Sequence, residues 1–168
     1  MSRSSHHRTA GVISDTHGRL AAEIFDIFSG VEVILHAGDV GGGDILIELG
    51  ALATVHAVSG NIDGFEIRDV APLRQVVDLG DLRVGLTHGH LHGGPSDRHR
   101  QLRQAFAGDR VDAVVYGHTH CPAADTSERP WVLNPGSASQ GRGGVRSVGL
   151  LRFGGDLSQP EFEVVRLD

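Results

Sequence analysis

The sequence predicts an α/β fold in which two packed β-sheets are flanked by helices. Three patterns indicate this fold. The first half alternates short apolar runs with longer amphipathic ones, the middle contains a hairpin signal, and the last third holds strand-like runs split by Gly-rich turns. Such alternation is typical of βαβ units, which place helices against a largely parallel sheet. At 168 residues with 39% hydrophobic residues, the chain has the size and composition of one globular domain.

The first half has the pattern of a βαβαβ unit. Leu20, Ile24 and Ile27 recur at helical spacing. Gly30 follows them as a helix stop signal. The next run is apolar on both faces, as expected for a buried parallel strand. We therefore expect strands at residues 10–14, 31–36 and 54–59, and helices at residues 18–29 and 44–52.

The second half has a more antiparallel pattern. Gly80-Asp81 is a turn pair between two apolar runs, so these runs predict a hairpin. Pro95 stands near the start of the next amphipathic segment, where a helix tolerates it. We expect strands at residues 74–79, 82–87, 111–116, 131–133, 147–153 and 161–167, and a helix at residues 95–106. Residues 1–8 are expected to form a flexible lead, and residues 9–168 a single domain.

The composition excludes several classes of protein. The chain has 21 Asp and Glu against 15 Lys and Arg, and its net charge of −6 argues against a basic nucleic-acid-binding surface. Cys121 is the single cysteine, so no internal disulfide forms and a reducing compartment fits. The apolar runs are far shorter than a membrane span requires. We expect a cytoplasmic protein that binds neither membranes nor nucleic acid, and the sequence is compatible with a homo-oligomer.

Residues that commonly bind metals follow the expected strands. In right-handed βαβ units, the carboxyl ends of consecutive strands meet at one sheet edge, and ligands bind there. Each such residue alone is compatible with an ordinary polar loop, but their joint occurrence favours a site. We expect seven side chains from five loops to converge: Asp15, His17, Asp39, Asn61, His88, His118 and His120.

This ligand set suits two divalent cations better than one. Seven oxygen and imidazole ligands exceed what one ion takes while it keeps a position open for substrate. An anionic ligand must lie between two such ions, and Asp39 on the central strand is the expected bridge. The pair would lower the pKa of a bridging water, and the resulting hydroxide would attack phosphorus in line with the leaving oxygen. We expect Mn²⁺, with Zn²⁺, Fe or Ni²⁺ as alternatives.

Six motifs occur in an order that resembles a known family: Asp15-x-His17, Gly38-Asp39, Gly60-Asn61-x-Asp63, His88-Gly89-His90, Gly117-His118-Thr119-His120 and Asn134-Pro135-Gly136-Ser137. Together they resemble the calcineurin-like metallophosphoesterase superfamily, in particular its small single-domain prokaryotic phosphodiesterase branch, to which the retromer scaffold subunit is related. The resemblance implies a four-layer αββα sandwich of two mixed β-sheets flanked by helices. It also implies two ligand sets that share one residue: Asp15, His17, Asp39 and His120 for one metal, and Asp39, Asn61, His88 and His118 for the other.

Ile62 departs from the pattern of this family. Many members carry His directly after the motif Asn, where it helps to protonate the leaving group, although the branch resembled here commonly lacks it. General acid assistance contributes about 10²–10⁴-fold to such reactions. We therefore expect activity on aryl phosphodiesters, whose leaving groups are good, and weaker activity on alkyl ones.

Two histidines and one aspartate outside the ligand set also have expected roles. We expect His90 and Asp63 to orient a ligand or the substrate, with a plain surface role as the alternative. We therefore place Asp39, Asn61, His90 and Asp63 in the catalytic machinery. His36 lies inside a predicted buried strand, so we expect a core histidine there.

The predicted function is phosphodiester hydrolysis on a small phosphate-ester substrate. A phosphomonoesterase or nucleotide phosphatase with the same metals is an alternative within enzymes. A protein-binding scaffold on the same fold is an alternative of another class. The complete set of Asp, Asn and His ligands argues against the scaffold, because a scaffold does not need them.

Overall fold

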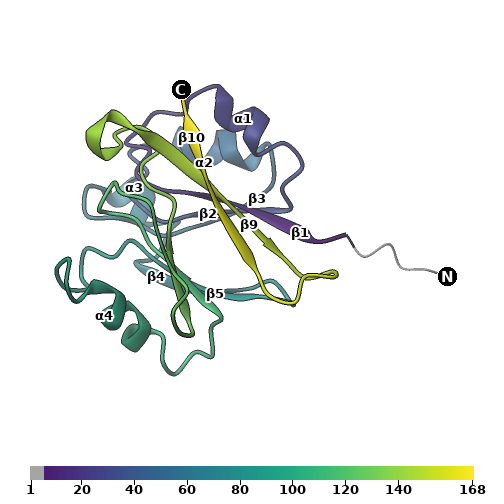
Figure 1. Cartoon of the computed structure of the whole chain (residues 1–168). Helices are drawn as coiled ribbons and strands as arrows, with labels where there is room; N and C mark the ends of the chain where they lie inside the picture. The colour runs from purple at the N-terminus through teal and green to yellow at the C-terminus, as the bar shows by residue number, and fades with distance from the viewer. Residues whose placement is uncertain (1–5) are drawn as a thin grey trace.

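The computed structural model describes residues 6–168 and contains two five-stranded sheets within them (Figure 1). The first sheet has the strand order β10-β9-β1-β2-β3. Strands β1, β2 and β3 run parallel to one another. Strand β9 pairs antiparallel with β1, and β10 at the sheet edge pairs antiparallel with β9. These strands are β1 Arg8–Ile13, β2 Val33–His36, β3 Thr54–Ala57, β9 Arg146–Phe153 and β10 Glu161–Leu167.

The second sheet has the order β4-β5-β6-β8-β7 and is also mixed. Its first two strands form the predicted antiparallel hairpin, while β5, β6 and β8 run parallel to one another. Its strands are β4 Arg74–Asp78, β5 Arg83–Thr87, β6 Ala113–Val115, β7 Ala123–Asp125 and β8 Trp131–Asn134. The helices are α1 Glu23–Ile27, α2 Gly43–Gly50, α3 Phe65–Arg68 and α4 Arg98–Ala105, with a 3-10 turn η1 at Arg142–Gly144.

The buried side chains show how these elements stack in layers. Val33 and Leu35 of β2 share one core cluster with Val84 and Leu86 of β5, so the two sheets face each other. Ile34 lies between the two β2 residues and faces the other way, because successive strand residues point to opposite faces. It packs in a second cluster with residues of α1, α2 and α3.

The opposite outer layer is built in the same way by α4. Val114 of β6 packs with Leu102 and Phe106 on the far face of the second sheet. The helices therefore cover both outer faces, with α1 and α2 on one side of the sheets and α4 on the other (Figure 1). This arrangement confirms the predicted four-layer α/β sandwich of two mixed sheets.

Several element boundaries differ from the sequence-based expectation. The helix expected at residues 18–29 is only the five-residue α1, because His17 and Gly18 adopt positive φ angles and a turn precedes the helix. The C-terminal strands do not build a separate antiparallel sheet but join β1. Strand pairing across the whole chain decides this, and no local pattern records it. The short elements α3 and β7 were not expected.

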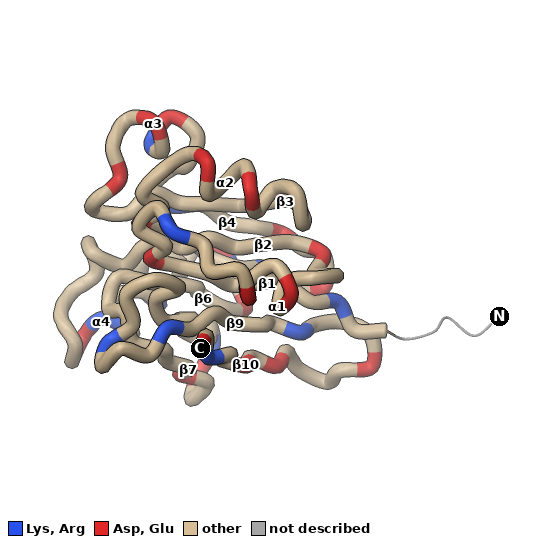
Figure 2. The backbone as a smooth tube through the Cα atoms, turned by 90° about the horizontal axis from the view of Figure 1, so that it is seen from above, with Lys and Arg blue, Asp and Glu red and all other residues tan. Residues whose placement is uncertain are grey.

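The predicted N-terminal lead lies partly outside the described residues, which begin at His6, and β1 already begins at Arg8. Acidic and basic residues are interspersed along the described backbone (Figure 2). No helix in residues 6–168 combines the length and apolar character needed to cross a bilayer.

Candidate metal centre

The loops that carry the predicted ligands have an unusual backbone. Among the described residues, six that are not glycine have a positive φ, and five of these six are predicted ligands. This left-handed region costs about 1–3 kcal/mol for an ordinary residue and persists only where the surrounding structure holds it. The loops are therefore held in strained conformations that aim particular side chains. The five are Asp15 (54°), His17 (47°), Asp39 (51°), His118 (67°) and His120 (57°).

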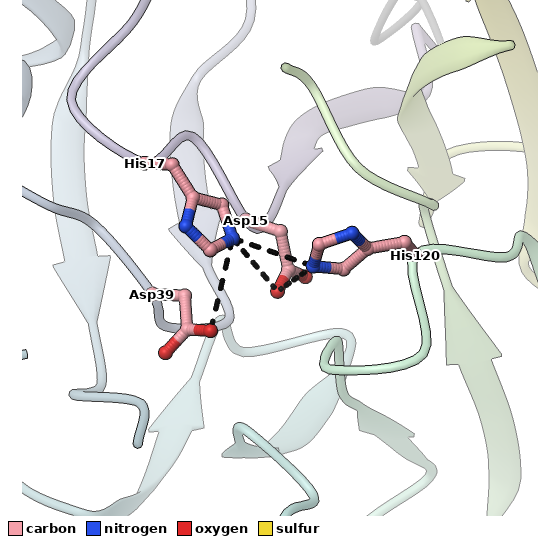
Figure 3. Close-up of side chains that lie close together, drawn as sticks. All are labelled: Asp15, His17, Asp39 and His120. Carbon is pink, nitrogen blue, oxygen red and sulfur yellow. Dashed lines mark hydrogen bonds and ion pairs between the residues drawn. The ribbon is translucent and has the colours of Figure 1, made fainter. Parts of the chain in front are cut away.

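Four predicted ligands from three loops meet at one point (Figure 3). One ligand atom from each of Asp15, His17, Asp39 and His120 lies within 4.8 Å of those of the others. His120 Nε2 is 3.1 Å from Asp15 Oδ1, and His17 Nε2 is 3.8 Å from Asp39 Oδ2. The two imidazole Nε2 atoms are 3.3 Å apart. Two carboxylates and two imidazoles around one point form a set that could hold a divalent cation.

Asp15 is oriented so that one carboxylate oxygen is available for a cation. Its Oδ2 accepts hydrogen bonds from Ser14 Oγ (2.6 Å) and from the backbone N–H of His118 (3.1 Å). Its Oδ1 is buried and has no hydrogen-bond partner among the described residues. Buried carboxylate oxygens are normally satisfied, so an orphaned one facing imidazoles fits a cation as its partner.

The second predicted set lies beside the first. His88 Nε2 is 3.2 Å from Asp39 Oδ2, and His118 Nδ1 is 3.2 Å from Asn61 Oδ1. The ring centroids of His88 and His118 are 5.3 Å apart. His88 Nε2 is also buried and lacks a hydrogen bond within the described chain, although Asp39 is close. The structure thus brings all seven predicted ligands into one region, with Asp39 between the two sets.

Backbone carbonyls fix two of the imidazoles. His88 Nδ1 donates to Ala37 O (2.7 Å), and His120 Nδ1 donates to Gln140 O (2.9 Å). Because a carbonyl oxygen can only accept, each Nδ1 carries a proton, and in the neutral ring each Nε2 keeps its lone pair. Metal-binding histidines are typically held in this way. Both Nε2 atoms point toward the carboxylates.

The local charges shift several pKa values. Burial alone would raise the pKa of Asp39, but His88, the N–H of Ile62 and the charge of His17 together outweigh it and lower the pKa overall. Burial would lower the pKa of His88, but Asp39 and Asp15 raise it. The contact with Asp15 raises the pKa of His120, whereas burial and the charge of His88 lower that of His118. The ionised form of the Asp39 carboxylate is therefore favoured at this site.

His90 lies next to the second set, whereas Asp63 does not face it. The ring of His90 is 5.4 Å from that of His88 and 6.2 Å from that of His118, and its Nδ1 is buried without a hydrogen bond to any described residue. Asp63 accepts hydrogen bonds from the backbone N–H groups of Val40, Gly41 and Gly60. It therefore ties the loop after β2 to the loop after β3.

His36 is the core histidine that the sequence predicted. It is fully buried; its Nε2 donates to Thr16 Oγ1 (3.0 Å), and its Nδ1 accepts from the N–H of Gly38 (3.2 Å). The hydroxyl of Thr16 donates onward to Val40 O (2.8 Å). Burial lowers the pKa of His36 to about 4, so the ring is neutral at pH 7. This network joins the loops that carry Asp15 and Asp39.

Other supports of the site were not predicted. The hydroxyls of Ser137 and Ser139 both donate to Asp15 O (2.9 Å each). Asn134 Nδ2 donates to Gly117 O (3.0 Å), so the Asn134-to-Ser137 motif braces two ligand loops. Serines are common in loops, so only the family motif drew attention to part of this segment.

Two glycines are required by close packing at the site. A Cβ on Gly60 would lie 2.0 Å from Asp39 Oδ1, and a Cβ on Gly117 would lie 1.9 Å from Ser14 Oγ. Both distances are shorter than any tolerated contact, so each glycine lets a ligand loop approach its neighbour. These positions explain the glycine that precedes Asn61 and the glycine that precedes His118.

A cavity of about 470 Å³ opens beside His118, and Arg98 and Arg142 are among its lining residues. Neither arginine was predicted as a functional residue. Arginines are frequent in this chain, and nothing in the spacing of these two sets them apart.

Known proteins are similar to this chain in sequence and in fold. A probable metallophosphoesterase of Methanothermobacter thermautotrophicus is 39% identical over 159 residues, covering 90% of this chain and 89% of that protein. Phosphodiesterase YfcE of Escherichia coli is 35% identical, covering 82% of this chain and 84% of its own length. The solved structure of Vacuolar Protein Sorting 29 from Cryptosporidium parvum has a TM-score of 0.75 at 22% identity, covering 96% of this chain and 98% of that one, which shows a shared fold.

A family profile also matches most of the chain. It is described as the calcineurin-like phosphoesterase superfamily domain, and it matches residues 9–156. This span includes all seven predicted ligands and confirms the resemblance inferred from the motifs. The chain belongs to the calcineurin-like phosphoesterase superfamily.

Proposed function

We propose that this protein hydrolyses phosphodiesters with two divalent cations held by two ligand sets that share Asp39. The observation that carries the proposal is the position of this carboxylate. Its Oδ2 lies 3.8 Å from His17 Nε2 on one side and 3.2 Å from His88 Nε2 on the other. The first set would be Asp15, His17, Asp39 and His120, and the second Asp39, Asn61, His88 and His118.

The donor set fits this assignment. Asp15 Oδ1 belongs to the first set and His88 Nε2 to the second, and both are buried without hydrogen bonds to described residues. A cation in each set would supply the partner that each atom lacks. Mn²⁺ suits mixed oxygen and imidazole ligands, and Zn²⁺, Fe or Ni²⁺ are alternatives.

When bound, two such cations lower the pKa of a water between them and stabilise negative charge on phosphoryl oxygens. The protein's own part is positioning. Asp39 keeps the two sets adjacent, while Ala37 and Gln140 lock the imidazoles of His88 and His120. Asn61 is exposed beside His118, so these two side chains would contact the phosphoryl group of the substrate.

We assign supporting roles to His90 and Asp63. His90 would keep the second set in place and reach the substrate, because its ring is near both His88 and His118. Asp63 would position the Asp39 and Asn61 loops through its hydrogen bonds to three backbone N–H groups. Neither residue needs to bind a cation in these roles.

Ile62 favours diesters with good leaving groups. Its backbone N–H donates to Asp39 Oδ1 (3.1 Å), so the residue borders the site, and its side chain is 48% exposed. An aliphatic side chain cannot protonate a leaving oxygen. The names of the phosphodiesterase relatives agree with diesters as substrates, and phosphomonoesters are the alternative.

The proposed substrate is a small phosphate ester, and we place the reaction in the cytoplasm. The single exposed Cys121 is compatible with a reducing compartment. The net charge of −6 and the interspersed charges in Figure 2 support a protein without a nucleic-acid-binding surface.

The test is a chelation and reconstitution assay with bis(p-nitrophenyl) phosphate. The chelated protein should lose activity and regain it with Mn²⁺, while Asp39→Asn should lose both bound metal and activity. Asp69→Asn, at an exposed aspartate outside both sets, is the matched control and should behave as wild type. Undiminished activity after chelation would contradict the proposal. Protein that binds no metal and cleaves neither diesters nor monoesters would instead favour a scaffold.

A further inference from the structure

The cavity beside His118 carries a positive charge. We call it the arginine cavity, after Arg98 and Arg142, which are the only Asp, Glu, Lys or Arg residues in its lining. In a protein with a net charge of −6, a cavity with two arginines and no carboxylate in its wall favours an anion. Its volume of about 470 Å³ lies within the usual range for small organic ligands.

Arg142 is attached directly to a ligand loop of the proposed metal centre. Its backbone N–H donates to His120 O (3.0 Å), and its Nε donates to Thr119 O (2.8 Å). The guanidinium is thereby held beside Thr119, which lies between the predicted ligands His118 and His120. A planar guanidinium has further N–H groups with which it can bind a carboxylate or a phosphate.

Arg98 approaches the cavity from the start of α4. Its Nη2 donates to Gly93 O (2.9 Å), which fixes the side chain. Its Nε is buried and has no hydrogen-bond partner in the described part of the chain. A buried guanidinium N–H normally has an acceptor, and none is present among the described residues. Arg98 and His118 both line this cavity.

A hydrogen-bonded chain fixes Tyr116 and His99 in the wall of the cavity. The Tyr116 hydroxyl donates to His99 Nε2 (2.8 Å), and His99 Nδ1 donates to Asp125 Oδ2 (3.1 Å). Arg103 Nη1 also donates to Asp125 Oδ2 (3.1 Å), so its charge is already compensated. Tyr116 is almost fully buried, so Pro95, Pro122 and Ala123 supply apolar surface in the cavity.

The cavity lies outside the cluster of ligands. Of the seven predicted ligands, only His118 lines it. If a phosphoryl group is held between the two ligand sets, its oxygens lie outside the cavity. One of its ester substituents would then extend into the cavity. The apolar surface fits a ring-sized group, and the two arginines fit a negative charge on that group.

We propose that the arginine cavity selects phosphodiesters in which one substituent is an apolar, ring-sized group. This substituent carries an anionic group of its own, either a carboxylate or a phosphate. This inference rests on the proposed phosphodiesterase function, because it places the phosphoryl group at the metal centre. It makes Arg98 and Arg142 specificity-determining residues of the reaction.

The first experiment compares three substrates of the Mn²⁺-reconstituted protein. These are p-nitrophenyl phenyl phosphate and its 4-carboxyphenyl and 4-phosphophenyl analogues. The wild type should favour at least one anionic analogue by about tenfold in kcat/KM, mainly through KM, since a charged hydrogen bond contributes about this much. The analogue that is favoured distinguishes a carboxylate from a phosphate ligand.

Variants show where the preference arises. The double variant Arg98→Gln and Arg142→Gln should bring the ratio of kcat/KM values close to one. Arg100→Gln is the matched control: it also lies on α4, is exposed, and does not line the cavity. It should keep the wild-type ratio. A wild type without preference, or a double variant that retains it, would overturn the proposal.

A binding measurement separates this inference from the proposed function. Titration calorimetry with phenylphosphonate and 4-carboxyphenylphosphonate or 4-phosphophenylphosphonate needs no turnover, because the phosphorus–carbon bond is not hydrolysed. If no diester is cleaved, the hydrolase proposal fails. The cavity proposal would still be supported if an anionic phosphonate binds about tenfold more tightly to wild type than to the double variant. Equal binding of all probes to both proteins would reject the cavity.

Discussion

Asp39 Oδ2 lies 3.2 Å from His88 Nε2, yet that nitrogen makes no hydrogen bond to any described residue. His88 Nδ1 donates to Ala37 O, so in the neutral ring Nε2 has a lone pair and faces another acceptor. Two acceptors this close need a cation or a proton nearby. The relationship explains why the ligand loops adopt strained backbones: the strain sets acceptor atoms toward one another, and bound metal would offset its cost.

Gly60→Ala should lower metal affinity. Its added Cβ would lie 2.0 Å from Asp39 Oδ1 and push this carboxylate or the Asn61 loop out of place. We expect a loss of about 10–100-fold in metal affinity, as for other changes that misplace a ligand. Isothermal titration with Mn²⁺ measures it. Gly64→Ala is the matched control, because a Cβ there meets no atom within 4 Å; equal affinities for the two variants would contradict the packing argument.

His90→Ala should keep both metals and lose only part of the rate. The ring lies 5.4 Å from His88 and belongs to neither ligand set, so its loss loosens the site without removing a ligand. We expect kcat to fall about 10–100-fold. Metal content by mass spectrometry and steady-state kinetics check this together. Loss of one metal equivalent would show that His90 is itself a ligand.

Ile62→His should improve the cleavage of substrates with poor leaving groups. The side chain is half-exposed at the site border, so an imidazole there could reach the leaving oxygen. The gain should approach, at most, the roughly 10²–10⁴-fold of general acid catalysis for alkyl esters and be small for p-nitrophenyl esters. Ile62→Leu serves as the control. A uniform change across leaving groups would remove proton donation as the explanation.

His36 should make the fold less stable in acid. Its folded pKa is about 4, below the ordinary 6.5, because burial disfavours the charged ring, although Asp15 and Asp63 oppose this. The contribution of the neutral His36 ring to the free energy of unfolding is therefore complete above pH 6.5 and is lost as the pH falls toward 4. It amounts to roughly 3 kcal/mol.

Urea unfolding of the chelated protein at several pH values measures this effect. The wild type should lose more stability between pH 7 and pH 4 than His36→Gln, which has no titrating ring. Identical pH dependences would show that His36 does not titrate in this range.

The sequence predicted the layers and the ligands better than the pairing and the supports. The consecutive apolar residues Val33, Ile34 and Leu35 indicate that both faces of β2 are buried. The convergence of the seven proposed ligands could be predicted because strand ends meet at one sheet edge whatever the details of each loop. The pairing of β9 with β1 depends on contacts across the whole chain, and no local pattern contains it.

The residues that the sequence did not reveal act through geometry. Arg98 and Arg142 line one cavity only because α4 and the loop at η1 lie close in space. Ser139 acts through the carbonyl of Asp15, a contact between distant segments. Such residues have no characteristic spacing, so only the folded arrangement identifies them.

The central claim is that two cations share Asp39, and anomalous diffraction from crystals grown with Mn²⁺ tests it most directly. We expect two anomalous peaks about 3.5–4 Å apart, the usual separation in a two-metal site, with the Asp39 carboxylate between them. A single peak among Asp15, His17 and His120, with His88 and Asn61 contacting no metal, would contradict it.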